Sequence, residues 1–338
     1  MAGLIDPEID ALLKDTSRSF YLTLEMLPKK IRRQVGLLYL LARVADTIAD
    51  TKTGSAQHLI EALERYDSVA QGISSELPDL QEIAELQENN GERKLLLNVA
   101  EVVSSLSIFG EDDKKLIRNC LGIIIGGQTL DLQRFGPAND SGAISALEKR
   151  EELDDYAYRV AGSVGEFWTH MTCNHIIQVR EKNRDVLFEL GIRFGKALQM
   201  INILRDIPED LRFGRCYIPI DSLEEIGLDK ADLLDPNNME KFRPLYNENL
   251  DITVSHLDAA VEYIGMLPYS QFRLRAACML PVLIGQRTVG MLRNQNVLDS
   301  EKRVKVSRDE IKDLVKKTKR ALLIPGAGQK LLRSNQNV

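Results

Sequence analysis

The chain has 338 residues, of which 44 % are hydrophobic and 28 % are charged. This composition is typical of a globular protein, and it excludes collagen, a disordered tail and a small disulfide-bonded scaffold. The net charge of −6 leaves no overall basic field that could hold nucleic acid, so any anionic ligand must be bound by local charges or by metal ions.

Neither the cysteines nor the N-terminal segment points to secretion. The 4 cysteines are far apart and form no C-x-x-C pair, which excludes a thiolate zinc site and favours a reducing compartment. The N-terminal segment is acidic and is interrupted by Pro7, unlike a secretory signal or a transit peptide. No run of about 18 apolar residues occurs, so no membrane-spanning helix is expected. We expect a cytoplasmic monomer that is at most peripheral to the inner face of a membrane.

Helical periodicity runs through the whole chain. Apolar residues recur at three- and four-residue spacing, which predicts helices over 28–50, 56–72, 92–107, 112–134, 146–180, 183–207, 240–264 and 271–295. Alternating strand-like runs with tight hairpin turns are missing. Residues 208–239 form the longest irregular stretch, rich in proline and glycine. With no low-complexity linker and no repeat, the sequence predicts one all-α domain, a helical bundle over residues 1–338.

Two of these helices are apolar almost all round, which is typical of helices inside a large bundle. Each carries one stripe of polar residues at three- and four-residue spacing, and therefore on a single face. The first stripe consists of Tyr39, Arg43, Asp46 and Asp50. The second consists of Gln199, Asn202, Asp206 and Asp210. Each stripe ends in two carboxylates one helical turn apart.

Buried carboxylates need a counter-charge, because each costs several kcal/mol when it is left uncompensated. One interpretation supplies the charge from arginine side chains in a structural network; the candidates are Arg43, Arg205, Arg212 and Arg215. The other interpretation is Mg²⁺, which carboxylates hold together with substrate phosphates. Two such stripes in one chain favour the metal. No histidine pair with zinc-ligand spacing and no glycine-rich phosphate loop occurs.

From about residue 14 to 308 the chain resembles the squalene/phytoene synthases, which join isoprenyl diphosphates head to head. The resemblance rests on four blocks in order, at residues 17–20, 39–50, 156–165 and 199–219. It implies an isoprenoid synthase fold with a central cavity between the two aspartate helices.

The resemblance also implies roles for individual residues. The metal positions fall on Asp46, Asp50, Asn202, Asp206 and Asp210. The diphosphate-binding arginines fall on Arg18, Arg43, Arg205 and Arg215, and other residues expected to line the site are Ser17, Phe20, Tyr39 and Gln199. Tyr156 matches a tyrosine proposed to assist proton transfer. Lys305 and Arg308 lie in a stretch that resembles the NADPH-contacting segment of squalene synthases.

The implied reaction condenses two farnesyl diphosphates with Mg²⁺ to a presqualene-type diphosphate, which NADPH then reduces to squalene. Asp46 is followed by Thr47, as in squalene synthases, whereas phytoene synthases usually carry two adjacent aspartates. Alternatives are an enzyme that makes presqualene diphosphate, dehydrosqualene or phytoene, and a non-catalytic assembly factor with the same fold. The retained acid pairs oppose the last of these.

The chain departs from the family pattern at two positions. Ala49 stands where eukaryotic squalene synthases often carry an acid, so one metal ligand would be lost. Pro208 lies between Asp206 and Asp210 and removes one backbone donor. We expect it to bend the helix while Asp210 stays near one turn from Asp206.

Overall fold

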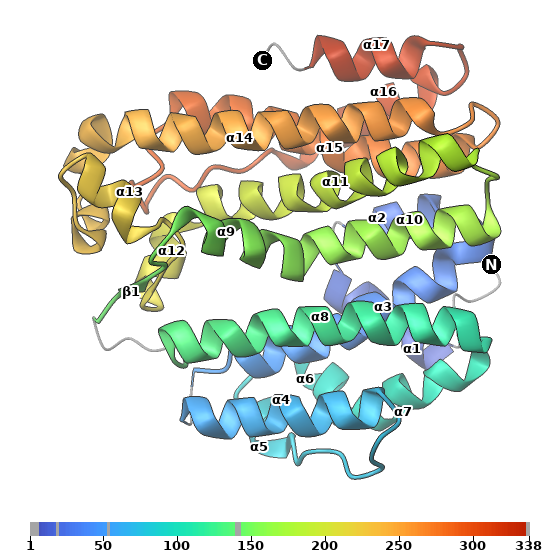
Figure 1. Ribbon diagram of the computed structural model, residues 1–338, viewed down its shortest axis with the longest axis horizontal. Coiled ribbons are helices and arrows are strands. Elements are labelled where there is room, and N and C mark those ends of the chain that lie inside the picture. The colour runs from blue at the N-terminus through green and yellow to red at the C-terminus, as the bar shows by residue number, and fades with distance from the viewer. Residues whose placement is uncertain (1–6, 18–19, 53–54, 139–142, 336–338) are drawn as a thin grey trace. The chain divides into compact units, whose positions relative to one another are not determined.

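The computed structural model describes residues 7–17, 20–52, 55–138 and 143–335. These residues are almost entirely helical (Figure 1). They form two compact units, here called unit 1, with Met1–Asn139 and His170–Ile176, and unit 2, with Asp140–Thr169 and Ile177–Val338. The single domain expected from the sequence stays a prediction.

Unit 1 is built around one long apolar helix. Its helices are α1 (Pro7–Ser17), α2 (Phe20–Met26), α3 (Lys29–Ala49), α4 (Ala56–Ala70), α5 (Gln81–Glu85), α6 (Asn90–Leu97), α7 (Val99–Ser104), the 3₁₀ turn η1 (Ser105–Ile108) and α8 (Glu111–Phe135). Helix α3 packs against α8, α4 and α6. Leu37, Leu40 and Ile48 of α3 are completely buried, which explains why a helix predicted over 28–50 forms over nearly those residues.

One predicted helix of unit 1 is divided. The stretch 92–107 was expected to be continuous, but α6 ends at Leu97 and α7 begins at Val99. The Asn98 side chain between them donates a hydrogen bond to the Lys94 carbonyl at 2.7 Å. Asparagine side chains compete in this way with the backbone bonds of a helix, so the prediction of one helix was wrong.

Unit 2 is a bundle of long helices with short elements at one end. Its elements are β1 (Ser145–Ala146), α9 (Arg150–Ala157), the π turn η2 (Tyr158–Gly162), most of α10 (Ser163–His175), η3 (Glu181–Asn183), α11 (Arg184–Arg205), α12 (Ile207–Arg212), β2 (Arg215–Cys216), α13 (Ile220–Glu225), η4 (Lys230–Leu234), η5 (Pro236–Asn238), α14 (Met239–Met266), α15 (Phe272–Asn294), α16 (Arg308–Ala321) and α17 (Ala327–Ser334). Helices α11 and α14 run side by side along most of their length (Figure 1).

Small residues allow α11 to approach α10 and η2 very closely. A Cβ atom on Gly165 would lie 1.9 Å from the Gly191 carbonyl oxygen. A Cβ atom on Gly195 would lie 2.0 Å from the Ala161 carbonyl oxygen. Neither distance is compatible with any side chain, so the spacing of α11 from α10 and η2 requires glycine at these positions.

Two predictions for unit 2 were wrong in detail. The stretch 146–180 is not one helix, because Ser145–Ala146 pairs in parallel with Arg215–Cys216 before α9 begins. The stretch 208–239, expected to be irregular, holds α12, α13 and two short 3₁₀ helices. Aspartates cap these 3₁₀ helices; the Asp229 carboxylate, for example, accepts from the Ala231 N–H at 3.2 Å. Apart from the two-residue strand pair, the described residues confirm the all-α class.

Among the residues that the structure describes, no helix is both long enough and apolar enough to cross a bilayer.

Candidate active site

The first polar stripe lies on α3 in unit 1. Asp50 is the C-terminal cap of this helix, and its N–H donates to the Asp46 carbonyl at 2.9 Å. This bond holds the two aspartates one helical turn apart. Asp50 is exposed, and about 33 % of the Asp46 side chain is exposed.

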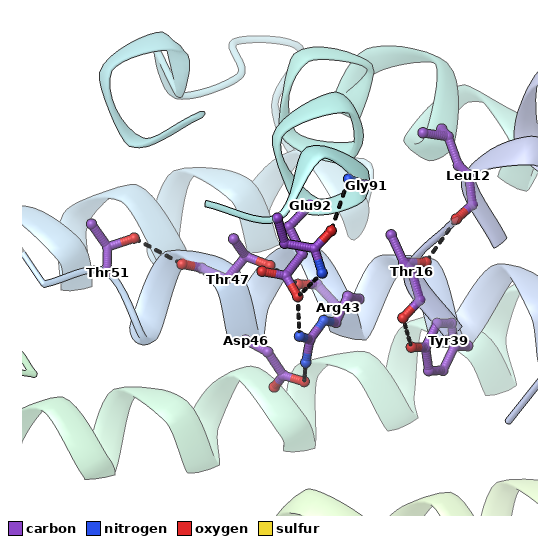
Figure 2. A network of polar contacts seen from close by, with 10 residues as sticks. Leu12, Thr16, Tyr39, Arg43, Asp46, Thr47, Thr51, Gly91 and Glu92 are labelled. Carbon is purple, nitrogen blue, oxygen red and sulfur yellow. Dashed lines mark hydrogen bonds and ion pairs between the residues drawn. The ribbon is translucent and has the colours of Figure 1, made fainter. Parts of the chain in front are cut away.

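Arg43 lies between two acidic side chains in unit 1 (Figure 2). Its Nη2 donates to Glu92 Oε1 of α6, and its Nη1 lies 3.9 Å from Asp46 Oδ2. Burial lowers the pKa of Arg43, but the charges of Asp46 and Glu92 outweigh this effect and raise it. Asn89 also donates to Glu92 Oε1, at 3.3 Å, so Glu92 is fixed from two sides.

Asp46 is held as an unusually weak acid. Burial raises its pKa to about 7, against the lowering effects of Arg43 and of a hydrogen bond from Gln128. The negative charges of Asp50 and Glu92 raise it further. Arg43 therefore lies between the Asp46 and Glu92 carboxylates, and carboxylate oxygens such as those of Asp46 are ligands that Mg²⁺ takes in proteins.

Other candidate residues of unit 1 lie at the start of the chain. The Tyr39 hydroxyl donates to the Thr16 carbonyl at 3.0 Å, and its ring stacks on Phe20 with centroids 5.1 Å apart. Ser17 is buried, and its hydroxyl donates to the Leu13 carbonyl within the same helix. Arg18 lies outside the described residues.

The second polar stripe follows the end of α11 in unit 2. Helix α11 ends at Arg205, and α12 begins at Ile207 with Pro208 in its first turn, where no N–H bond is needed. The Asp206 N–H donates to the Asn202 carbonyl and the Asp210 N–H donates to the Asp206 carbonyl, both at 2.9 Å. The expectation that Asp210 stays one turn from Asp206 despite Pro208 is confirmed.

Two guanidinium groups hold the Asp206 carboxylate. Arg205 Nε donates to Asp206 Oδ1 at 2.9 Å, and its Nη2 donates to Oδ2. Arg303 Nη2 donates to Asp206 Oδ1 at 3.0 Å and lies 2.9 Å from Glu209 Oε2. Arginine is therefore a counter-charge at Asp206, as the first interpretation expected of Arg205. Oδ1 accepts from both guanidinium groups, so a cation that bound this oxygen would have to displace one of them.

Sequence reasoning missed Arg303, Glu92 and Gln128. The sequence held a signal for Arg303, because Arg303 and Lys305 alternate with Val304 and Val306. In the structure both valines are buried, at 2 % and 5 % exposure, and Arg303 and Lys305 are exposed. No local pattern marks Glu92 or Gln128. Arg212, one of the expected counter-ions, instead donates to the Pro208 carbonyl at 3.2 Å.

The tyrosine expected to move protons has a tyrosine partner. Tyr156 and Tyr217 stack with centroids 4.7 Å apart, and the Tyr217 hydroxyl donates to the Tyr156 hydroxyl at 3.2 Å. Both are buried at 7 % exposure. Arg215 is also buried, in β2, whereas Asn202 is exposed.

The remaining candidates differ in exposure. Gln199 on α11 is half-buried. Lys305 and Arg308 are exposed, and Arg308 is the first residue of α16.

No three His, Cys, Asp or Glu side chains within the described ranges lie close enough to hold a metal ion by themselves. A magnesium ion at either stripe would take its remaining ligands from phosphate oxygens and water, which is its usual behaviour in proteins.

Comparisons with known proteins identify relatives. Residues 13–310 match the family model described as squalene/phytoene synthase. The 15-cis-phytoene synthase of Synechocystis sp. is 29 % identical over 244 residues, a match covering 70 % of this chain and 61 % of that enzyme. The chain thus spans less than two thirds of the length of this relative.

Solved structures share the fold. TcSQS in complex with a ligand aligns with a TM-score of 0.78 at 19 % identity, over 97 % of this chain and 90 % of that chain. A dehydrosqualene synthase in complex with a ligand aligns with a TM-score of 0.64 at 21 % identity, over 94 % of this chain and 96 % of that chain. The chain has the all-helical isoprenoid synthase fold that was predicted.

Proposed function

The chain belongs to the squalene/phytoene synthase family, and from this premise we propose that it is a prenyltransferase that condenses two prenyl diphosphates head to head. One observation supports this most directly. Each acid pair keeps its two aspartates one turn apart through a 2.9 Å backbone bond, Asp50 to Asp46 in unit 1 and Asp210 to Asp206 in unit 2. A non-catalytic protein of this fold would need neither pair.

We propose that the carboxylates of both stripes, with the Asn202 amide, hold Mg²⁺ against the diphosphate of the substrate. Magnesium bound there supplies positive charge that stabilises diphosphate as it leaves. With Ala49 in place of an acid, the first stripe has two carboxylates, which matches the one or two that Mg²⁺ commonly takes from protein.

In this proposal side chains of the protein bind the diphosphate and contact the rest of the substrate. The diphosphate-binding guanidinium groups are those of Arg18, Arg43, Arg205 and Arg215. The residues that contact the substrate are Ser17, Phe20, Tyr39 and Gln199. The C1–O bond of one substrate breaks, diphosphate leaves with the electron pair, and the C2=C3 bond of the second substrate attacks the cation. Apolar helix faces exclude the water that would quench it.

Tyr156 is proposed to help remove the proton whose loss closes the cyclopropane of the intermediate. Its support is its partner: the Tyr217 hydroxyl donates to the Tyr156 hydroxyl at 3.2 Å, which fixes the position of the Tyr156 oxygen and would stabilise negative charge on it. The proton leaves the carbon that forms the ring, and the electron pair of its C–H bond forms the new C–C bond.

We propose squalene as the product, with NADPH supplying the hydride of the second step at Lys305 and Arg308. Support for this choice is the Asp46-Thr47 pair in the first stripe. The second candidate is phytoene, made from geranylgeranyl diphosphate without reductant, because the 29 % identical Synechocystis relative is a 15-cis-phytoene synthase. We further propose that the protein works in the cytoplasm as a monomer.

The experiment incubates the chain and Mg²⁺ with farnesyl diphosphate or geranylgeranyl diphosphate, with and without NADPH, and identifies the extracted hydrocarbons. Squalene formed only with NADPH is expected. A C40 product from geranylgeranyl diphosphate alone would select phytoene instead. Asp46→Asn and Asp206→Asn should each abolish diphosphate release, while Asp185→Asn, an exposed aspartate of α11, should not. Full turnover by either motif variant would reject the metal role.

A further inference from the structure

We propose that one end of unit 2 is a docking surface for an anionic membrane. The surface has an apolar tip and a basic border. The tip consists of Tyr269, Phe272, Leu323 and Ile324. The border consists of Lys316, Lys319, Arg320 and Lys330.

The apolar tip brings together two turns that are far apart in sequence. Leu323 is 80 % exposed, Ile324 62 %, Phe272 56 % and Tyr269 44 %. The turn between α14 and α15 touches the turn after α16, because the Tyr269 hydroxyl donates to the Leu322 carbonyl at 2.7 Å. Figure 1 shows the end of α14 and the turn leading into α17 at the same end of the bundle. Large apolar side chains that are exposed and lie together in this way mark a contact surface.

The basic border lies in a part of the chain that has no acidic residue. Residues 314–338 hold 6 Lys and Arg and no Asp or Glu, although the whole chain has a net charge of −6. All six basic residues are exposed; they are Lys316, Lys317, Lys319, Arg320, Lys330 and Arg333. A surface that is locally basic on an acidic protein fits an anionic partner.

The helices beside the tip, α16 and α17, bury one face inside the protein. Leu314, Thr318 and Ala321 of α16 are buried, and so is Leu332 of α17. Their exposed faces therefore carry the basic side chains, which places positive charge beside the apolar tip. Apolar side chains that enter the acyl boundary, with Lys and Arg at the headgroup level, are the usual pattern of peripheral membrane binding.

The choice of a lipid surface rather than an acidic protein rests on the proposed function. A prenyl diphosphate is an amphiphile and the hydrocarbon product is insoluble in water. Both therefore partition into a bilayer, where an enzyme held at the membrane would find one and release the other.

The test is cosedimentation of the full-length chain with vesicles of phosphatidylcholine alone or mixed with phosphatidylglycerol, at low and at high salt. We expect binding to the mixed vesicles that weakens at high salt. Lys316→Glu with Lys319→Glu should lower the partition coefficient at least about tenfold. Leu323→Ser with Ile324→Ser should lower it by about the same factor, since both side chains are exposed and their loss should leave the fold intact.

Matched controls change the same residue types elsewhere. Lys115→Glu with Lys182→Glu, and Ile73→Ser at a residue that is 81 % exposed, should bind as the parent does. Equal losses in the controls, or no binding to mixed vesicles, would overturn the proposal; the latter would leave the surface to an acidic protein. Hydrocarbon formation in detergent, measured separately, tells a failure of docking from a failure of the proposed function.

Discussion

Arg303 donates a hydrogen bond to Asp206 at 3.0 Å across 97 positions of the chain. The same carboxylate accepts from Arg205, its neighbour in sequence. Asp206 and Glu209 are thereby neutralised by the protein itself, which explains how acids are tolerated beside the half-buried Arg205 at the end of α11. The two interpretations of this stripe, an arginine counter-charge and a metal ion, therefore place two different cations at the same Asp206 carboxylate.

Arg303→Gln should therefore tighten Mg²⁺ binding. Arg303 is 58 % exposed, so its ion pairs are screened by solvent and contribute at most about 1 kcal/mol, which corresponds to about a fivefold change in affinity. The measurement is the Mg²⁺ concentration that half-saturates the thermal stabilisation of the chain in the presence of inorganic diphosphate. Lys302→Gln, at the exposed neighbouring residue, is the control. A Mg²⁺ dependence unchanged by Arg303→Gln would show that the ion does not compete with this arginine.

The helices that carry the stripes could be predicted from the sequence, because apolar residues recur at helical spacing within each of them. Helix α3 was expected over 28–50 and spans Lys29–Ala49. The spacing of Asp206 and Asp210 could also be predicted, since a proline in the first turn of a helix breaks no bond.

The partners of the stripe residues could not be predicted in the same way. Glu92 lies 49 positions from Arg43, and Gln128 lies 82 positions from Asp46. Which side chain meets which across such separations depends on how the helices pack, and periodicity within one helix carries no information on that. The break at Asn98 was missed for a different reason, because an asparagine can bond its own backbone either inside or at the end of a helix.

Glu92→Gln should destabilise unit 1. Glu92 is 15 % exposed and accepts from both Arg43 and Asn89, so the variant leaves a half-buried guanidinium with a weaker partner. The cost lies between those of an exposed and a buried pair, about 1–2 kcal/mol of unfolding free energy. Urea unfolding measures it, with the exposed Glu88→Gln as control. Equal stability of Glu92→Gln and the parent would mean that the pair with Arg43 contributes nothing to the fold.

His256 should make the folded chain less stable in mild acid. Burial, followed by the charges of Arg193 and Lys196, lowers its pKa to about 4, although Asp154 acts in the opposite direction. Arg193 Nε donates to His256 Nδ1 at 3.3 Å, which keeps that nitrogen unprotonated. In the unfolded chain the pKa is about 6.5. Between these values the unfolded state binds more protons, so stability is full above about pH 6.5 and falls as the pH drops toward 4.

His256→Gln should remove this part of the pH dependence. The measurement is the unfolding free energy of parent and variant in urea at about pH 7 and about pH 5. We expect the parent to lose more stability than the variant over this interval. His58→Gln, at an exposed histidine, should behave as the parent does. Parallel losses in the parent and in His256→Gln would assign the acid sensitivity to other groups.

Gly165→Ala should disrupt the packing of α10 on α11. The new methyl group would lie 1.9 Å from the Gly191 carbonyl oxygen, and the atom that would have to move is backbone rather than a flexible side chain. Overpacking of this kind costs typically about 1–3 kcal/mol, and rigid backbone on both sides places the expected loss at the upper end. Gly110→Ala is the matched control, because nothing lies within 4 Å of the position that its new Cβ atom would take and its φ of −66° suits any residue. Thermal unfolding of both variants would show a large loss for Gly165→Ala alone. A loss within about 0.5 kcal/mol would instead mean that the two helices separate easily, and that their close approach is not what fixes the position of the second stripe.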